Sequence, residues 1–505
     1  MLTALRRIRP SCGATYSHAR TLATAAATAP HPRERGPRKE GDISSVFASL
    51  SGTEGTALPA RFADVKSHII RGNESAIQAS WLRLLKALRS EIELISSSGS
   101  DIIPEIESSE IKNFSRTQPF AFALKKRGVA ILRGVVDPDV ALGWKEEIRA
   151  YIRANPSTKA FPKDNPAVYE LYWSPGQVKA RAHPNVLEAQ RFLMSFWHSK
   201  DADAAISTEY PVSYADRVRI RPPGDSGFAL GPHVDGGSVE RWEPEGYGLG
   251  DPYHSIFAGK FEEFDPWESS TRLRVESDLY NGAGACSMFR MFQGWLSMSE
   301  TGPGEGTLFV NPLFGLATSY FLLRPFFSPR NPDPARSGYL DAENWQLDPV
   351  QTPLLQGASL GCTQELTNTL HPHLELDKTM VHVPVVQPGD YVAWHCDTLH
   401  AVDKIHKGVG DSSVLYIPAC PLTEANARYL VQQRNAFLAG TPGPDFPGGM
   451  GEREHVGRMG VKDIEQAGGD EALRAMGLQA WDLDAKTERE KSFLKAMNQC
   501  LELPA

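Results

Sequence analysis

The chain has 505 residues, and its composition, 41% hydrophobic and 23% charged, is typical of a globular protein rather than a disordered or fibrous one. This length allows one large domain with elaborations, or two to three domains of average size. The formal net charge of -8 creates no basic field that would attract phosphates, so we expect no nucleic-acid partner. No apolar stretch reaches the roughly 20 residues that a bilayer-spanning helix needs, so we expect no membrane partner.

The N-terminal residues 1–35 have the composition of a mitochondrial presequence. No acidic residue precedes Glu34, and Ser, Thr and Ala are frequent. The basic residues of this segment are Arg6, Arg7, Arg9, Arg20 and Arg33. The composition predicts import into the mitochondrial matrix, and the alternative is a disordered basic N-terminus on a cytoplasmic protein. The six cysteines form no C-x-x-C pair, which suits a reducing compartment and argues against a disulfide framework.

Residues 36–60 are rich in Pro and Gly and predict a flexible linker. From Asp64 to about Ser97, apolar residues recur at helical spacing, which predicts one or two helices with a break at Gly72 and Asn73. The aliphatic run 127–136 predicts a strand, and 140–152 predicts the helix that follows it. We place the main domain at 61–435 and a C-terminal extension at 436–505.

Short β-rich runs separated by Gly/Pro turns follow at 217–220, 286–298, 307–310, 380–386, 391–395 and 413–417. This spacing predicts an antiparallel barrel or sandwich rather than a parallel α/β sheet. Two insertions, at 242–275 and 312–378, are long enough to predict lids or binding loops. A helix is expected from Thr423 to about Gln433.

The run Gly231-Pro232-His233-Val234-Asp235-Gly236-Gly237 holds the residues with the clearest chemistry. Side chains two apart on an extended strand point to the same side, so His233 and Asp235 can present a nitrogen and a carboxylate to one ion. A second histidine from elsewhere would complete a 2-His-1-carboxylate face, which suits iron(II) that activates oxygen. Similar triplets at 373–375 and 395–397 leave capping or surface roles open for any one of them.

The downstream run 387–400 has a Pro-Gly-Asp turn, a strand and a terminal histidine. In this it resembles the phytanoyl-CoA-hydroxylase-like branch of the 2-oxoglutarate/Fe(II)-dependent dioxygenases, and that pattern makes His400, rather than His395, the third ligand. The runs 219–242 and 297–307 resemble the DUF1479 (YbiU-like) family. The resemblance implies a mainly β, α+β fold with a double-stranded β-helix (jelly roll) core, flanking N- and C-terminal helices and long insertions. It implies iron(II) as cofactor, with His233, Asp235 and His400 as catalytic metal ligands, and 2-oxoglutarate and O2 as cosubstrates.

The residue that would anchor 2-oxoglutarate is less well defined. Relatives in the wider superfamily usually place an Arg about ten residues after the distal histidine, because its planar fork binds a carboxylate in bidentate fashion. Residues 401–415 contain no Arg. The candidates are Arg219, Arg290, Ser413 and Lys404, and for the arginines a structural ion pair is the alternative. Iron binding therefore rests on more residues than the use of 2-oxoglutarate does.

Two other functions use the same residues. A cupin-like hydrolase or isomerase would hold zinc or manganese on this face and activate water, and a catalytically inert jelly-roll binding protein would keep the ligands without turnover. Trp242 and Tyr247 are candidates for the substrate entrance or for the core, Tyr172 to Arg181 for a polar patch, and His371 with His373 for loop residues or metal ligands. The substrate is expected to be a small organic molecule whose identity is open, as is the oligomeric state.

Overall fold

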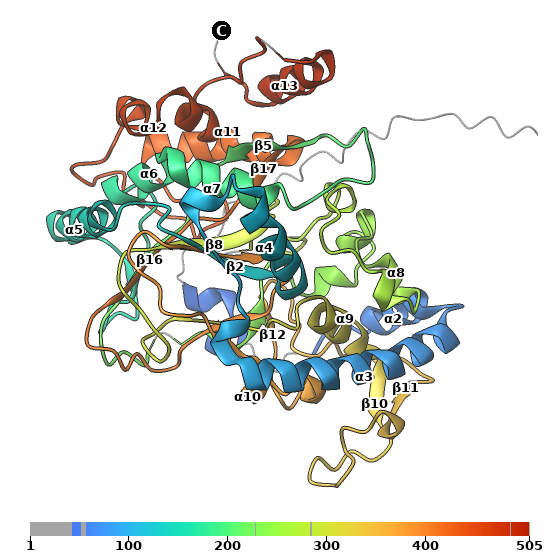
Figure 1. Ribbon diagram of the computed structural model, residues 1–505. Helices are drawn as coiled ribbons and strands as arrows, with labels where there is room; N and C mark the ends of the chain where they lie inside the picture. Colours follow the sequence, from blue (N-terminus) through green and yellow to red (C-terminus); the bar gives the residue numbers. More distant parts are fainter. Residues whose placement is uncertain (1–42, 52–56, 228, 283–284, 485, 504–505) are drawn as a thin grey trace, which may run out of the picture. The chain divides into compact units, whose positions relative to one another are not determined.

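The computed structural model describes residues 43–51, 57–227, 229–282, 285–484 and 486–503. The predicted presequence lies outside these residues. Within them the fold is mixed α and β, with two larger sheets at the centre and helices on both sides (Figure 1). No helix in the described ranges is long and apolar enough to cross a membrane.

The larger sheet has eight strands, and its neighbouring strands are antiparallel except for β1 and β2. In spatial order the strands are β1 (Glu105–Glu107), β2 (Val129–Arg133), β14 (Tyr391–His395), β8 (Phe292–Ser297), β16 (Ser412–Tyr416), β6 (Val218–Arg221), β4 (Val168–Tyr169) and β3 (Ala160–Phe161). Every residue of β8 is buried, as expected for a central strand that is covered on both faces.

The second sheet has five antiparallel strands, in the order β12 (Gln364–Glu365), β7 (His233–Val234), β15 (His400–Val402), β9 (Leu308–Val310) and β13 (Val381–His382). Apolar side chains from both sheets, among them Trp295, Val310 and Val414, belong to one core cluster. Two further pairs are β5 (Ile206–Val212) with β17 (Cys420–Thr423) and β10 (Phe327–Pro329) with β11 (Trp345–Leu347).

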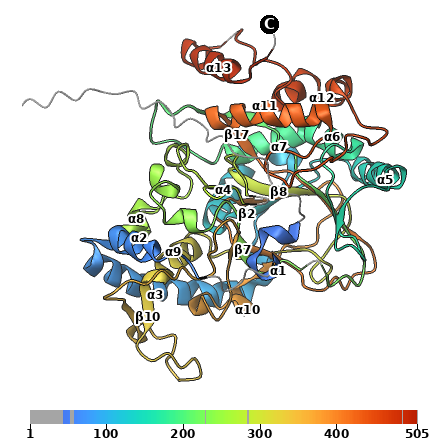
Figure 2. The same ribbon diagram turned by 180° about the vertical axis from the view of Figure 1, so that it is seen from behind.

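The helices α2 to α13 fall into two groups around these sheets (Figures 1 and 2). The first group comprises α2 (Arg61–Ile70), α3 (Glu74–Ser98), α8 (His254–Phe257), α9 (Gly315–Leu323) and α10 (Leu376–Thr379). The second comprises α4 (Phe114–Arg127), α5 (Pro138–Ala154), α6 (Pro175–Ala182), α7 (Pro184–Met194), α11 (Glu424–Ala439), α12 (Val461–Ala475) and α13 (Glu488–Cys500). The predicted helix break at Gly72 is confirmed, because this glycine has a φ of +83° between α2 and α3.

Three segments differ from the sequence-based expectation. Part of the expected linker folds as a 3-10 turn (Ile43–Val46) and α1 (Ala48–Ser51). The insertion 312–378 supplies α9, whose side chains are buried nearly all round, so this part packs in the core instead of forming a surface loop. The expected domain boundary at 435 falls within α11, and α11 to α13 contribute to a core cluster shared with β5 and β17. Short apolar runs inside insertions give no periodic signal that would have revealed these elements.

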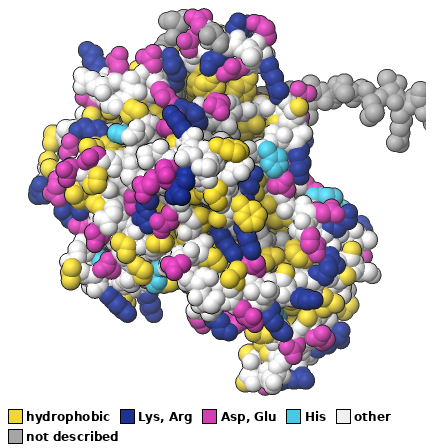
Figure 3. Space-filling model, in the orientation of Figure 1, with side chains coloured by type: hydrophobic (Ala, Val, Ile, Leu, Met, Phe, Trp, Pro, Cys, Tyr) yellow, Lys and Arg dark blue, Asp and Glu magenta, His cyan; other side chains and the backbone are white. Residues whose placement is uncertain are grey.

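Surface charges of both signs are interspersed on the face shown in Figure 3.

Candidate metal centre

Two neighbouring strands of the five-stranded sheet bring His233, Asp235 and His400 together. His400 of β15 is the register partner of His233 of β7, and Asp235 follows directly after β7. The Nε2 atom of His233 lies 3.6 Å from Asp235 Oδ1, and Nε2 of His400 lies 3.9 Å from Asp235 Oδ2. Two ligands at right angles, each about 2.1 Å from a common ion, would be about 3 Å apart. The three side chains therefore need only small adjustments to share one ion.

Hydrogen bonds fix both histidines in the tautomer that metal binding requires. Nδ1 of His233 lies 2.7 Å from the Gly231 carbonyl oxygen, and Nδ1 of His400 lies 3.0 Å from the Thr398 carbonyl oxygen. A carbonyl oxygen only accepts, so each Nδ1 carries the proton and donates it. Each Nε2 then keeps its lone pair, which lies on the side of Asp235. The hydrogen bond from Nδ1 to the carbonyl oxygen holds each ring in place.

The groups around Asp235 favour its ionised carboxylate. Burial alone would raise its pKa, but His233, His400 and Arg290 outweigh burial and lower the pKa to about 2. Burial, together with the neighbouring His233, lowers the pKa of His400 to about 3, so its imidazole is neutral near pH 7. A neutral imidazole and an ionised carboxylate are the forms that bind a metal ion.

The turn after Asp235 is held from behind by a buried arginine. Arg241 donates from Nη2 to the Asp235 carbonyl oxygen at 2.6 Å, and from Nη1 to that of Gly237. The Tyr247 hydroxyl also donates to a carbonyl oxygen of this turn, that of Gly236, at 2.6 Å. Gly237 has a φ of +92°, and a Cβ there would lie 2.8 Å from the Ser277 carbonyl oxygen. Only glycine fits this turn.

Two residues that sequence reasoning missed also contact the triad. Thr363 donates its hydroxyl to Asp235 Oδ1 at 3.3 Å. The Phe47 ring packs edge-on against His233, with ring centroids 4.9 Å apart, and Figure 2 shows α1 close to β7. A hydrogen bond of 2.9 Å from the Thr363 amide to the Val46 carbonyl oxygen holds this N-terminal segment to the site. No local motif marks either residue, because both reach the site through long-range packing.

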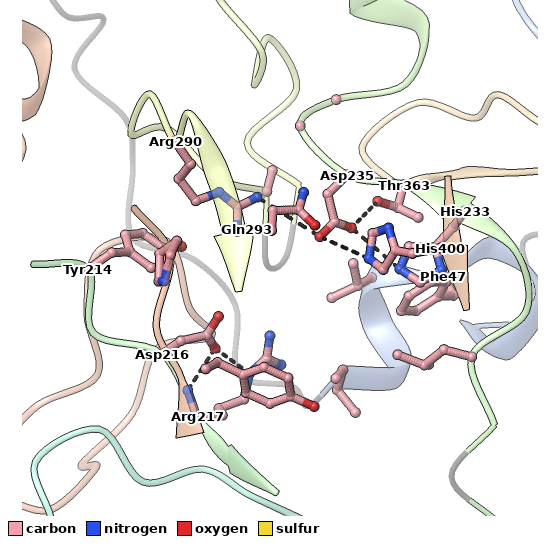
Figure 4. Close-up of a pocket in the computed structure, with 18 of the residues that line it drawn as sticks. Phe47, Tyr214, Asp216, Arg217, His233, Asp235, Arg290, Gln293, Thr363 and His400 are labelled. Atoms are coloured by element: carbon pink, nitrogen blue, oxygen red, sulfur yellow. Dashed lines mark hydrogen bonds and ion pairs between the residues drawn. The ribbon is translucent and has the colours of Figure 1, made fainter. Parts of the chain in front are cut away.

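A cavity of about 1180 Å³, part of it open to solvent, lies beside the triad and is lined by all three of its residues (Figure 4). Three arginines line it as well. Arg217 is balanced by two carboxylates, with Nε 3.3 Å from Asp216 Oδ1 and Nη1 3.8 Å from Glu170 Oε1. Arg219 is 2% exposed and donates to the Ser412 hydroxyl at 3.3 Å, while its Nε has no hydrogen-bond partner.

Ser413 and Lys404, two of the expected cosubstrate ligands, do not line this cavity. Ser413 is buried, and its hydroxyl donates to Asp411 on the side of β16 opposite Tyr416, which lines the cavity. Lys404 is exposed, and its carbonyl oxygen accepts a hydrogen bond of 3.2 Å from Arg221. Arg219 and Arg290 are therefore the expected anchors that the structure does place in the cavity.

A second cluster of metal-ligand types, His395, Cys396 and Asp397, follows β14. Nδ1 of His395 accepts from the Asp397 amide at 3.0 Å, and Nε2 donates to the Pro266 carbonyl oxygen at 2.9 Å. Asp397 forms a buried ion pair with Arg272, with 3.3 Å between Nη1 and Oδ1. Burial raises the pKa of the Cys396 thiol to about 12. These ligand atoms are already committed to protein contacts.

The other sequence candidates are structural. Trp242 is buried and donates to the Leu322 carbonyl oxygen at 3.1 Å. Tyr172 and its neighbour Trp173 lie in the core cluster shared with α11. His373 is buried between Tyr320 and Trp345.

Comparisons with known proteins agree on one family. A family model described as Gig2-like matches residues 56–478. The uncharacterized protein YbiU of Escherichia coli (strain K12) is 31% identical over 400 residues, which cover 77% of this chain and 88% of YbiU. The crystal structure of GlcNAc Inducible Gene 2, GIG2 (DUF1479), from Candida albicans aligns with a TM-score of 0.77 and 30% identity over 88% of this chain and 95% of that one. The "Putative Oxidoreductase" of Salmonella typhimurium LT2 aligns with a TM-score of 0.70 and 29% identity over 83% and 98%.

Proposed function

This chain belongs to the Gig2-like family, and we propose that it is a mononuclear non-haem iron(II) oxygenase that uses 2-oxoglutarate to oxidise a small organic substrate. One observation carries the proposal. The Nε2 lone pairs of His233 and His400 and the carboxylate of Asp235 converge beside a cavity, and each Nδ1 proton is donated to a backbone carbonyl. Two imidazoles and one carboxylate on one face leave further coordination positions for small molecules, which is the ligand set of iron(II) oxygenases.

The sheet arrangement supports this proposal. An eight-stranded and a five-stranded antiparallel sheet share one core, and the ligands come from the strands β7 and β15 of the smaller sheet. We propose that these sheets form the double-stranded β-helix that the family resemblance implies. In that fold the space between the sheets holds the metal and the cosubstrate.

Arg219 is the residue that we assign to the distal carboxylate of 2-oxoglutarate. It projects from β6, opposite Val414 of β16, and lines the same cavity as the triad. Burial lowers its pKa, and within the described chain no carboxylate lies within 4.0 Å of its guanidinium. A buried cation without a carboxylate partner is costly, and a bound carboxylate would offset that cost.

These contacts assign separate roles to the cofactors and to the protein residues. Iron(II) and 2-oxoglutarate supply the oxidising chemistry when bound. His233, Asp235 and His400 hold the metal, Arg219 orients the cosubstrate, and Phe47 shields His233 from water. Arg241 and Thr363 keep Asp235 in place through its backbone and its carboxylate. The protein therefore contributes binding, orientation and exclusion of water.

One observation favours a hydrolase as the second candidate. Burial raises the pKa of Glu240 to about 7, and this carboxyl group lines the cavity. A carboxylate with such a pKa would suit a general base, and a zinc or manganese ion held by the three ligands would supply the activation of water. A zinc or manganese hydrolase would then use Glu240, whereas an oxygenase needs no such base.

Anaerobic titration separates these candidates. We expect Fe(II) to bind the wild-type protein with a stoichiometry of about one, and we expect 2-oxoglutarate to add a visible charge-transfer band. Arg219→Gln should weaken 2-oxoglutarate binding about tenfold or more while iron binding persists, because a charge-assisted hydrogen-bond pair is lost. Absence of the band in the folded, iron-loaded wild type would contradict the oxygenase. Loss of hydrolytic turnover in Glu240→Gln with zinc would support the alternative.

We also propose that residues 1–35 direct the protein to the mitochondrial matrix. Expression of the full chain with a C-terminal tag should give a mature form in the matrix that is shorter at its N-terminus. A cytosolic, full-length product would contradict this localisation.

A further inference from the structure

Arg290 is a cation of the cavity, and its one ion pair within the described residues, with Asp235, is long. It lies just before β8, and its side chain is 13% exposed. Its nearest carboxylate oxygen is Asp235 Oδ2, 4.0 Å from Nη2, which is beyond hydrogen-bond distance. Among the described residues it donates no hydrogen bond, and it lines the cavity, so its planar fork keeps donors for a ligand.

The surroundings hold this guanidinium in position. It lies over the Tyr214 ring, 5.6 Å from the ring centroid, and the Tyr214 hydroxyl is itself anchored by a bond of 3.1 Å to Asp445. Figure 4 shows Arg290 and Gln293 on the same side of the cavity as Asp235. Arg290 is therefore placed next to the metal ligands before any ligand binds.

Gln293 adds a second donor at the same place. Its Oε1 accepts a bond of 2.6 Å from the Trp394 indole, which fixes the orientation of the amide. The amide nitrogen then remains for the cavity that Gln293 lines, and it donates no hydrogen bond within the described residues. A guanidinium with an oriented amide donor beside it fits a planar or tetrahedral oxyanion.

Metal binding should leave the positive charge of Arg290 less well balanced, so an anion should bind beside it more favourably. When Asp235 coordinates a divalent cation, its negative charge is shared with that ion and balances Arg290 less. The cavity would then hold two arginines without a full counter-charge, Arg219 and Arg290. Arg217 also lines the cavity, but ion pairs with Asp216 and Glu170 balance its charge. Two such cations imply two bound anionic groups.

We infer that Arg290 and Gln293 form a second anion site, which binds a carboxylate or phosphate group of the substrate. This inference rests on the proposed function, in which Arg219 takes the distal carboxylate of 2-oxoglutarate. The substrate is therefore an anionic small molecule, whose charged group is bound at Arg290 beside the metal. Such a contact would position the remainder of the substrate for oxidation.

The test uses the full chain loaded with Fe(II) under anaerobic conditions and saturated with N-oxalylglycine, an unreactive analogue of 2-oxoglutarate. Propionate and inorganic phosphate are the anionic probes, and propionamide is the neutral control. We expect calorimetry to show one propionate or phosphate site in the wild type and no binding of propionamide. Arg290→Gln should weaken this site about tenfold or more, and Arg290→Lys should do so less, because it keeps the charge and loses the fork.

Arg83→Gln serves as the matched control, because it removes the same charge from a surface pair with Glu262, and it should leave the affinity unchanged. Near-ultraviolet circular dichroism shows whether each variant is folded. If Arg290→Gln does not fold, the test relies on Arg290→Lys. Equal propionate affinity in the wild type and the Arg290 variants would overturn the inference, since the probe would then bind elsewhere, for example at the metal. A parallel loss of N-oxalylglycine affinity would also overturn it, because Arg290 would then hold the cosubstrate.

The same titration without metal distinguishes this inference from the proposed function. A protein that binds no iron but still binds phosphate through Arg290 would contradict the oxygenase and leave the anion site intact. A protein with the 2-oxoglutarate band but no Arg290-dependent anion binding would contradict only the inference.

Discussion

Two clusters in this protein contain the same kinds of side chain but differ in what their nitrogen and oxygen atoms are doing. In the cluster of His233, Asp235 and His400, each histidine donates from Nδ1 and leaves Nε2 free to bind. In the other cluster, both nitrogens of His395 are hydrogen-bonded and Asp397 is paired with Arg272. Ligand-type residues in proximity are therefore not sufficient. The hydrogen bonds around the two clusters differ in which ligand atoms they leave available to a metal.

The same substitution in both clusters should give the largest contrast. Asp235→Asn is expected to reduce iron bound per chain from about one to near zero, because a neutral amide oxygen is a poor replacement for a carboxylate ligand. Asp397→Asn should leave the iron content of the folded protein unchanged. Anaerobic equilibrium dialysis with iron analysis measures both. Equal iron loss in the two variants would remove the distinction between the clusters.

The free energy of unfolding should respond strongly to Asp397→Asn, although the iron content should not. Asp397→Asn leaves the buried Arg272 guanidinium without its counter-charge, and we expect the free energy of unfolding to fall by about 3 to 5 kcal/mol. Urea unfolding followed by tryptophan fluorescence gives this value. Asp341→Asn, in an exposed pair with Arg89, is the control and should cost about 1 kcal/mol or less. A loss of similar size in both variants would show that the Arg272 pair has no special structural role.

Acid should destabilise the protein through His395. Burial lowers the pKa of this imidazole to about 3, whereas the unfolded chain takes up its proton near pH 6.5. The unfolded state therefore binds more protons between these values, and stability falls as the pH decreases from about 6.5 toward 3. Between pH 7 and pH 5 this histidine should account for about 2 kcal/mol.

The difference between wild type and His395→Gln isolates this contribution, because His371 and His373, whose pKa values burial also lowers, are common to both proteins. Urea titrations at several pH values should show a shallower acid dependence in the variant. Identical pH dependence would contradict a buried, neutral His395.

Cys396→Ser should have the smallest effect. The Cys396 sulfur lies 3.6 Å from Arg272 Nη1, so a hydroxyl there keeps a donor partner. We expect a change in unfolding free energy of about 1 kcal/mol or less and unchanged iron binding. A loss of iron in this variant would place a thiolate among the ligands and contradict the assignment.

The contrast between the clusters also explains what the sequence could predict. His233 and Asp235 are two apart on one strand end, and His400 ends a strand pattern, so their proximity follows from local spacing and family resemblance. The expected relationship to the DUF1479 (YbiU-like) family is confirmed by the Gig2-like family match and by the similarity to YbiU. The sequence could not show that both nitrogens of His395 are hydrogen-bonded, because one partner is the Pro266 carbonyl oxygen, 129 residues away in the chain.

Phe47 and Thr363, which contact the triad, could not be predicted from the sequence for similar reasons. Phe47 comes from a segment that resembled a linker and precedes the family match at residue 56. Thr363 lies in an insertion without periodicity, beside the short strand β12 that pairs with β7. The sequence could nominate Arg219, Arg290, Ser413 and Lys404 as anion ligands, but only the side chains' directions show which two face the cavity. Strand ends and long loops carry too little pattern to fix such directions.

The most direct test of the account is the position of the metal itself. Crystals of the protein loaded anaerobically with Fe(II) should show an anomalous difference peak at the iron edge, about 2 Å from Nε2 of His233, Nε2 of His400 and an oxygen of Asp235. Such a peak would establish this cluster as the metal centre. A peak at Cys396 and Asp397, or a fully loaded protein whose iron lies at neither cluster, would contradict it.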